Sequence, residues 1–103
     1  MSYDIVIFDE NDKVYKELAI NLESHYKLAS IIQENNIDLL SRLVDYYSDC
    51  EFLNTEIEQL KQELRDLSNI NNIDSNLKKI INDFVDICVT AQKYGKKIFG
   101  IAD

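Results

Sequence analysis

The sequence predicts a mainly α fold: a compact three- to four-helix bundle that forms one domain over residues 1–103. Three observations favour it. Apolar residues recur at spacings of three and four over most of the chain, which is the period of an amphipathic helix. Asn-rich stretches divide these runs into separate segments. The length and the 46% hydrophobic fraction are those of one small globular domain.

The chain begins with a short strand and a helix. Residues 3–8 read Y-D-I-V-I-F, which is typical of a strand, and D-E-N-D at 9–12 ends it. Asn11 or Asp12 is the expected N-cap of a helix from about 13 to 34. Asn35-Asn36 ends that helix, because Asn tolerates a left-handed C-cap. The apolar face of the helix contains Leu18, Leu22, His25, Ala29 and Ile32.

A second helical stretch runs from Ile37 to Leu67 and is expected to be broken into two helices. Unbroken, it would be roughly 45 Å long at 1.5 Å per residue, which is long for this domain. Its two apolar stripes are out of step by one residue, and the slip falls between Cys50 and Asn54. The segment T-E-I-E at 55–58 fits a capping box for the second helix. That helix carries a heptad stripe: Leu53, Ile57, Leu60, Leu64 and Leu67.

Residues 68–75 form the clearest loop, and the last helix follows it. Asp74 or Ser75 is its expected N-cap, and Gly95 its C-cap. The tail K-K-I-F-G-I-A-D then looks extended. A lone strand has no stable partner, so the N-terminal strand is the candidate partner for this tail.

The charge is −8 and unevenly distributed. Residues 1–12 carry four acids and no base, and residues 38–66 carry eight acids and three bases. Nucleic acid and anionic membranes are excluded as direct partners, because phosphate contacts need clustered Lys and Arg. A basic protein partner is favoured, although the same acidity also serves solubility. We expect a cytoplasmic protein, since the N-terminus lacks the basic start of a signal peptide and no apolar run could span a membrane.

The candidate partner-binding residues lie in the acidic middle of the chain. Asp38, Asp45 and Asp49 are seven and four residues apart, which places them on one outer face if the segment is helical. Tyr46 lies beside them as an exposed aromatic anchor, and Glu56 continues the seven-residue steps. Carboxylates next to a tyrosine suit the Lys and Arg side chains of a partner. A solvated helix face has the same pattern.

No motif indicates catalysis, a cofactor or a metal. The single histidine, His25, falls on an apolar stripe and is expected to be a hydrogen-bonded core residue. Cys50 and Cys88 are too few and too isolated for a zinc site or a disulfide framework. With only two glycines, the chain has no Gly-rich phosphate loop. We therefore expect a protein that is not an enzyme and binds neither cofactor nor metal.

A small, acidic, Asn/Ile/Lys-rich chain that begins Y-D-I-V-I-F and ends K-K-I-F-G-I-A-D resembles bacterial immunity proteins of contact-dependent or polymorphic toxin systems. The resemblance covers the general character of the whole chain. It implies a cytoplasmic protein that binds and neutralises one cognate toxin domain and has no catalytic residues of its own. The acidic middle of the chain favours a nuclease as that toxin, and a toxin of another activity is the alternative. The alternatives are a helical adaptor or oligomerisation module, in which the heptad stripe pairs with another helix, and a phage-encoded anti-defence inhibitor.

Overall fold

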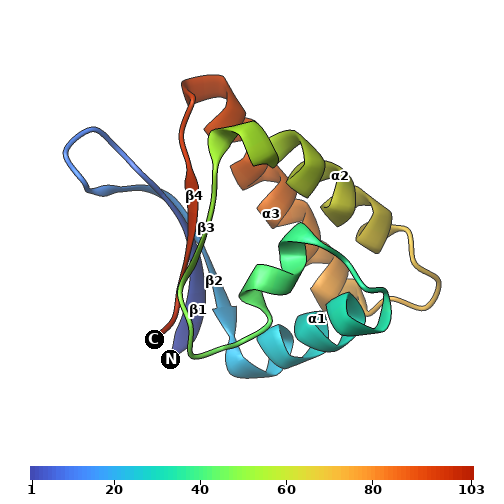
Figure 1. Ribbon diagram of the computed structural model, residues 1–103. Helices are drawn as coiled ribbons and strands as arrows, with labels where there is room; N and C mark the ends of the chain where they lie inside the picture. The colour runs from blue at the N-terminus through green and yellow to red at the C-terminus, as the bar shows by residue number, and fades with distance from the viewer.

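A four-stranded antiparallel sheet with strand order β2-β1-β4-β3 forms one layer of the fold, and the helices form the other (Figure 1). This computed structural model describes residues 1–103. The strands are β1 (Ser2–Phe8), β2 (Val14–Asn21), β3 (Cys50–Phe52) and β4 (Ile98–Ile101). The helices are α1 (Leu22–Glu34), α2 (Ile57–Ser68) and α3 (Ser75–Tyr94), with two short 3-10 helices, η1 (Leu39–Leu43) and η2 (Asn54–Glu56). The fold class is therefore α+β.

The first and last strands of the chain, β1 and β4, lie side by side in the middle of the sheet (Figure 1). β1 pairs with β4 so that Asp4 lies opposite Ile101 and Val6 lies opposite Phe99. The predicted first strand and its pairing with the tail are both present. β3 extends the sheet beyond β4, with Glu51 opposite Phe99.

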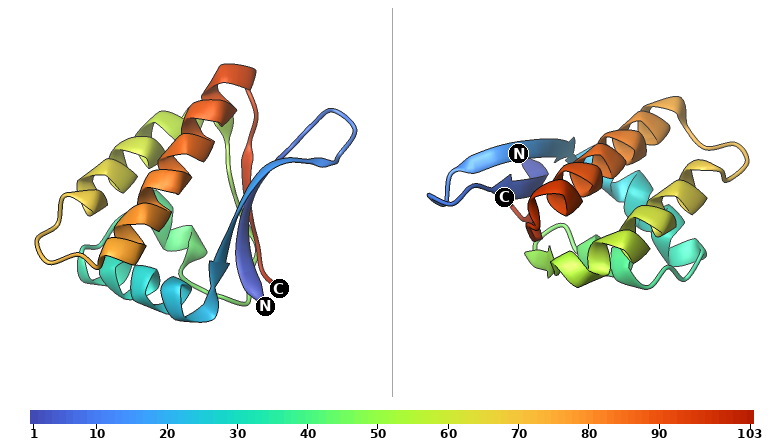
Figure 2. Two further views of the ribbon diagram at one scale, coloured as in Figure 1. Left: turned by 180° about the vertical axis from the view of Figure 1, so that it is seen from behind. Right: turned by 90° about the horizontal axis from the view of Figure 1, so that it is seen from above.

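All the helices cover the same face of the sheet, and the core lies between the two layers (Figure 2). β1 contributes Tyr3, Ile5 and Ile7 to this core. Fully burying a large apolar side chain stabilises a protein by roughly 1.5–3 kcal/mol, so the sheet and the helices hold each other in place. The buried side chains of α2 and α3 include Ile57, Leu60, Leu64, Leu67, Leu77, Ile81, Phe84, Ile87 and Cys88.

The expected mainly α helical bundle is wrong, first because residues 14–21 form a strand. The predicted helix over 13–34 is correct only from Leu22 onward. Lys16, Leu18 and Ile20 alternate on the side of β2 that faces the helices, and every residue of β2 except Tyr15 pairs with β1. Leu18 fits a strand, because it is two residues from Ile20, and it also fits a helix, because it is four residues from Leu22. The pairing of β2 with β1 selects the strand. The helix N-cap is Asn21 instead of Asn11 or Asp12, with its side chain accepting from the Ser24 amide at 2.8 Å.

The second correction concerns residues 37–56. The predicted break is present between Cys50 and Phe52, but as the edge strand β3. The segment before it contains only the 3-10 turns of η1, so no α-helix covers residues 38–49. At the start of the next helix the Glu56 carboxylate accepts from the Leu53 amide at 2.9 Å, in place of the predicted box at 55–58.

The C-terminal half agrees with the predictions. The segment between α2 and α3 is the expected loop, and Asp74 caps α3 by accepting from the amides of Asn76 and Leu77 at 2.7 and 3.3 Å. Gly95 ends α3 in the left-handed conformation, with φ at 63°. None of the helices combines the length and the apolar character that crossing a membrane takes.

Candidate protein-binding surface

One face of the sheet carries no covering layer (Figures 1 and 2). Successive side chains of a strand point to opposite faces, so the residues that alternate with the core positions point away from the helices. We call this surface the open face. It consists of Asp4, Val6 and Phe8 of β1, Glu17 and Ala19 of β2, Glu51 of β3, and Phe99 and Ile101 of β4.

The centre of the open face is apolar. The rings of Phe8 and Phe99 lie against each other, with centroids 5.4 Å apart and planes at 59°. Val6 lies between strand neighbours and is only 2% exposed although no helix covers it. Phe8, Phe99 and Ile101 are half-buried, so each retains apolar surface that a partner could cover. A central apolar area of this kind is what the core of a protein interface uses.

The rim of the open face is acidic. Asp4, Glu17 and Glu51 are its charged residues, and none of them takes part in an ion pair. Lys16 is the only basic residue in any of the four strands, and its ammonium group donates to Thr90 on α3 at 3.1 Å. The strands therefore place only negative charge on this face, and it complements a basic partner.

The acidic rim continues at the corner where the chain ends meet. Asp49 accepts from the Ala102 amide at 2.7 Å, which ties the approach to β3 to the end of β4. Asp103 follows Ala102 in the chain, and its carboxylate lies 3.7 Å from the Met1 ammonium group. Tyr47 is 76% exposed and packs edge-on against Tyr46, with ring centroids 5.4 Å apart. We call Asp4, Tyr46, Tyr47, Asp49 and Asp103 the terminal corner.

The five predicted partner-binding residues do not share one face, although Tyr46 and Asp49 both lie in the terminal corner. Their common helix face does not exist, because residues 44–49 are not helical. Asp45 and Asp49 flank the turn that leads into β3. Asp38 is exposed but lines a shallow depression between α1 and η1, away from them. Tyr46, expected to be exposed, is buried, and its neighbour Tyr47 is the exposed aromatic residue.

Besides Asp49, two more of the predicted acids have structural partners. Asp45 accepts from the Tyr47 amide and the Ser48 hydroxyl, both at 2.9 Å, and these bonds lower its pKa. Glu56 receives both guanidinium nitrogens of Arg42, at 2.7 and 2.6 Å, which together with the Leu53 amide holds its pKa at about 2. Both carboxylates therefore stabilise turns of the chain itself.

The acids and aromatic residues of the open face were not predicted from the sequence. The signal that could have found them is the alternation Lys16, Leu18, Ile20, which places Glu17 on the opposite face if the segment is a strand. Glu51 could be found only by recognising three residues as a strand, and runs that short carry little periodicity.

His25 is buried in an aromatic cluster, as predicted. Its Nε2 atom lies 2.7 Å from the Leu43 carbonyl oxygen, and its ring packs on Tyr3 and Tyr46 at 4.9 and 5.1 Å. Burial lowers the pKa of His25, against the opposing effects of the Leu43 carbonyl and of Asp45. Burial also raises the pKa of Cys50, so its thiol is held in the protonated, less nucleophilic form.

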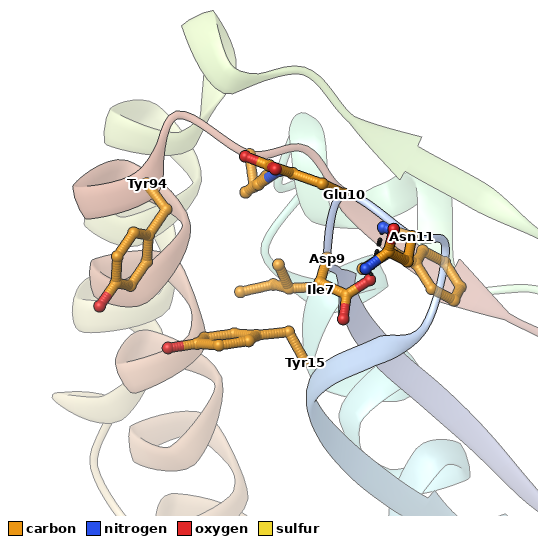
Figure 3. A pocket seen from close by; sticks show the side chains of 8 residues that line it. Ile7, Asp9, Glu10, Asn11, Tyr15 and Tyr94 are labelled. Carbon is orange, nitrogen blue, oxygen red and sulfur yellow. Dashed lines mark hydrogen bonds between the residues drawn. The ribbon is translucent and has the colours of Figure 1, made fainter.

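An open cleft of about 310 Å³ lies at the other end of β1, beneath the β1–β2 hairpin (Figure 3). A bulge gives β2 one extra residue, Tyr15, whose ring lies edge-on to Tyr94 with centroids 5.6 Å apart. The cleft offers phenols, carboxylates and one amine but no serine, cysteine or histidine that could form a nucleophile–base pair. Its lining residues are Ile7, Phe8, Asp9, Glu10, Asn11, Tyr15, Tyr94 and Lys96.

Comparison of the chain with protein-family models, with curated proteins and with solved structures gives no match. The structure contains no group of three or more His, Cys, Asp or Glu side chains arranged to hold a metal ion.

Proposed function

We propose that the chain is a cytoplasmic immunity protein that binds a cognate bacterial toxin domain, a nuclease, and neutralises it stoichiometrically. The observation that carries the proposal is the open face, which combines an apolar centre with charged strand residues that are all acidic. The whole-chain resemblance to immunity proteins supports the same function.

Charge complementarity supports this function. A nuclease must attract phosphate, so the surroundings of its active site are basic. Asp4, Glu17 and Glu51 present carboxylates to such a surface without intramolecular ion pairs that would first have to break. The charges speed the encounter, and burial of Phe8 and Phe99 supplies affinity.

The structure offers less support for a helical adaptor. The heptad stripe that would form its coiled-coil seam faces the core, since Leu60, Leu64 and Leu67 are fully buried. Leu53 is the one residue of the stripe with substantial exposure, at 40%. A seam already used inside the molecule cannot also pair with another helix without unfolding the core.

The test of the proposal is growth rescue. The toxin domain encoded directly upstream of the gene for this chain would be expressed with and without the chain. We expect the domain to stop growth and the chain to restore it. A domain that kills equally in both cases would refute the immunity function.

Charge reversal then tests the surface. The double variant Glu17→Lys with Glu51→Lys is expected to slow association with the toxin domain, most strongly at low salt, because surface charges act over roughly one Debye length. The double variant Glu34→Lys with Asp66→Lys is the matched control, since it makes the same change in net charge at two exposed acids on the helical side. Equal association rates for the two proteins would show that the partner binds elsewhere.

A further inference from the structure

Tyr46 carries a buried hydroxyl group that has no partner. Its side chain is 7% exposed, and its Oη atom makes no hydrogen bond. Buried polar atoms in native structures are nearly always paired, so one without a partner indicates a partner that is absent from the free chain. The aromatic ring of Tyr46, in contrast, packs against the rings of His25 and Tyr3.

The surroundings of this hydroxyl group are negative. After burial, the charges of Asp103 and Asp4 are among the causes that raise the pKa of Tyr46. Asp4 lies opposite Ile101 in the sheet, and Asp49 bonds to Ala102, so these carboxylates gather at the end of β4. The unpartnered hydroxyl therefore belongs to the acidic terminal corner.

These carboxylates still have acceptor capacity. Asp4 uses its Oδ1 atom to accept from the Ser2 hydroxyl at 2.6 Å, and Asp49 uses its Oδ1 atom for the Ala102 amide. The Oδ2 atom of each makes no hydrogen bond within the chain, and neither residue has a Lys or Arg partner. They do not converge closely enough to hold a metal ion. An extended cation with several donors suits this spacing better than a single ion.

We propose that the terminal corner binds the guanidinium group of an arginine side chain. The inference rests on the proposed function, because the arginine belongs to the basic toxin domain. A guanidinium group has five N–H donors in a plane, so it can bond to carboxylates on two sides and donate to Tyr46 Oη. Its flat face can also lie on the exposed ring of Tyr47. The Tyr46 oxygen is closed to solvent in the free chain, so the groups that cover it shift when the arginine enters.

The first experiment uses a small probe and no toxin. N-acetyl-arginine amide would be titrated into the full chain and followed by NMR, with the uncharged isostere N-acetyl-citrulline amide as the control. We expect the arginine compound to shift resonances of residues 4, 46–49 and 101–103 with a dissociation constant of about 1–10 mM, and the citrulline compound to leave them unchanged. No shifts there, or equal shifts with both compounds, would overturn the inference.

The second experiment removes the hydroxyl group alone. Tyr46→Phe is expected to leave the chain as stable as before or more stable, because it deletes a polar group that has no partner. It should nevertheless weaken binding of the toxin domain roughly tenfold to a hundredfold, as expected for a lost hydrogen bond to a charged group. Tyr26→Phe is the matched control, because Tyr26 is 73% exposed on α1. Unchanged affinity in Tyr46→Phe would overturn the inference.

The two proposals can fail separately. Arginine binding at the terminal corner without growth rescue would refute the toxin domain as the partner and support the arginine site. Growth rescue without arginine binding would leave the immunity function and remove the site.

Discussion

Gly100 lies where the sheet and the aromatic cluster approach most closely, and Gly100→Ala is expected to destabilise the protein strongly. An added Cβ atom would lie 2.7 Å from Tyr3 Oη, 2.8 Å from Cys50 Sγ and 2.9 Å from Tyr3 Cε1. The Tyr3 ring cannot move aside freely, because it is fully buried and its hydroxyl donates to the Ser48 carbonyl at 2.9 Å. Overpacking costs about 1–3 kcal/mol and the strained hydrogen bond about 1 kcal/mol more, so the free energy of unfolding should fall by about 2–4 kcal/mol.

Denaturant titration of four proteins tests this reasoning: wild type, Gly100→Ala, Cys50→Ala and the double variant. Cys50→Ala removes one of the clashing atoms, so the penalty of Gly100→Ala should be smaller in that background. Gly95→Ala is the control for glycine replacement in general. At Gly95 no atom lies within 4 Å, but φ is +63°, so the cost is conformational and about 1 kcal/mol. A Gly100→Ala penalty below about 0.5 kcal/mol, or equal penalties in both backgrounds, would refute the steric explanation.

Three further predictions follow from buried or paired groups. Burial lowers the folded-state pKa of His25 below its ordinary value of 6.5, so the unfolded chain binds this proton more readily. Stability should therefore fall as pH drops below about 6.5, and His25→Gln should flatten that slope in denaturant titrations between pH 7.5 and 5. The pKa of Glu56 is lowered to about 2, so its contribution is present above its ordinary value of 4.5 and is lost between there and pH 2. Glu56→Gln should lower the melting temperature at pH 7 but much less at pH 2, as scanning calorimetry would show. Leu64→Ala should cost about 2–5 kcal/mol of unfolding free energy in urea titrations, whereas Leu53→Ala, on the exposed end of the stripe, should cost far less.

Caps and long apolar helices were predictable because their signals are local. Asp74 and Gly95 act at fixed offsets from the ends of α3, and that helix is long enough to repeat its apolar period several times. The first strand and its pairing with the tail were also predictable, since an isolated β-branched run needs a partner for its backbone. Each of these inferences uses residues within one element or a simple requirement for hydrogen bonding.

The strand β2 could not be predicted in this way because its sequence fits two structures. Leu18 and Leu22 have helical spacing, while Leu18 and Ile20 have the spacing of a strand. What decides is the pairing with β1, a contact between segments that local propensity does not contain. The error extended to function, because the faces of a strand and of a helix expose different residues. Glu17 was therefore overlooked, and the acids of residues 38–49 were placed on a helix that does not exist.

The distinction between acids that hold the fold and acids that are free follows from the same geometry. Asp45 and Glu56 each bond through both oxygens to nearby groups, so changing them alters folding as well as any contact with a partner. Glu17 and Glu51 make no side-chain hydrogen bond or ion pair, and their charge contributes repulsion within an already acidic chain. Replacing them should therefore leave the fold intact, so a loss of partner binding in those variants can be assigned to the surface itself. Unpaired charges on an uncovered, partly apolar sheet face do not stabilise the isolated chain. A basic partner would pair with them.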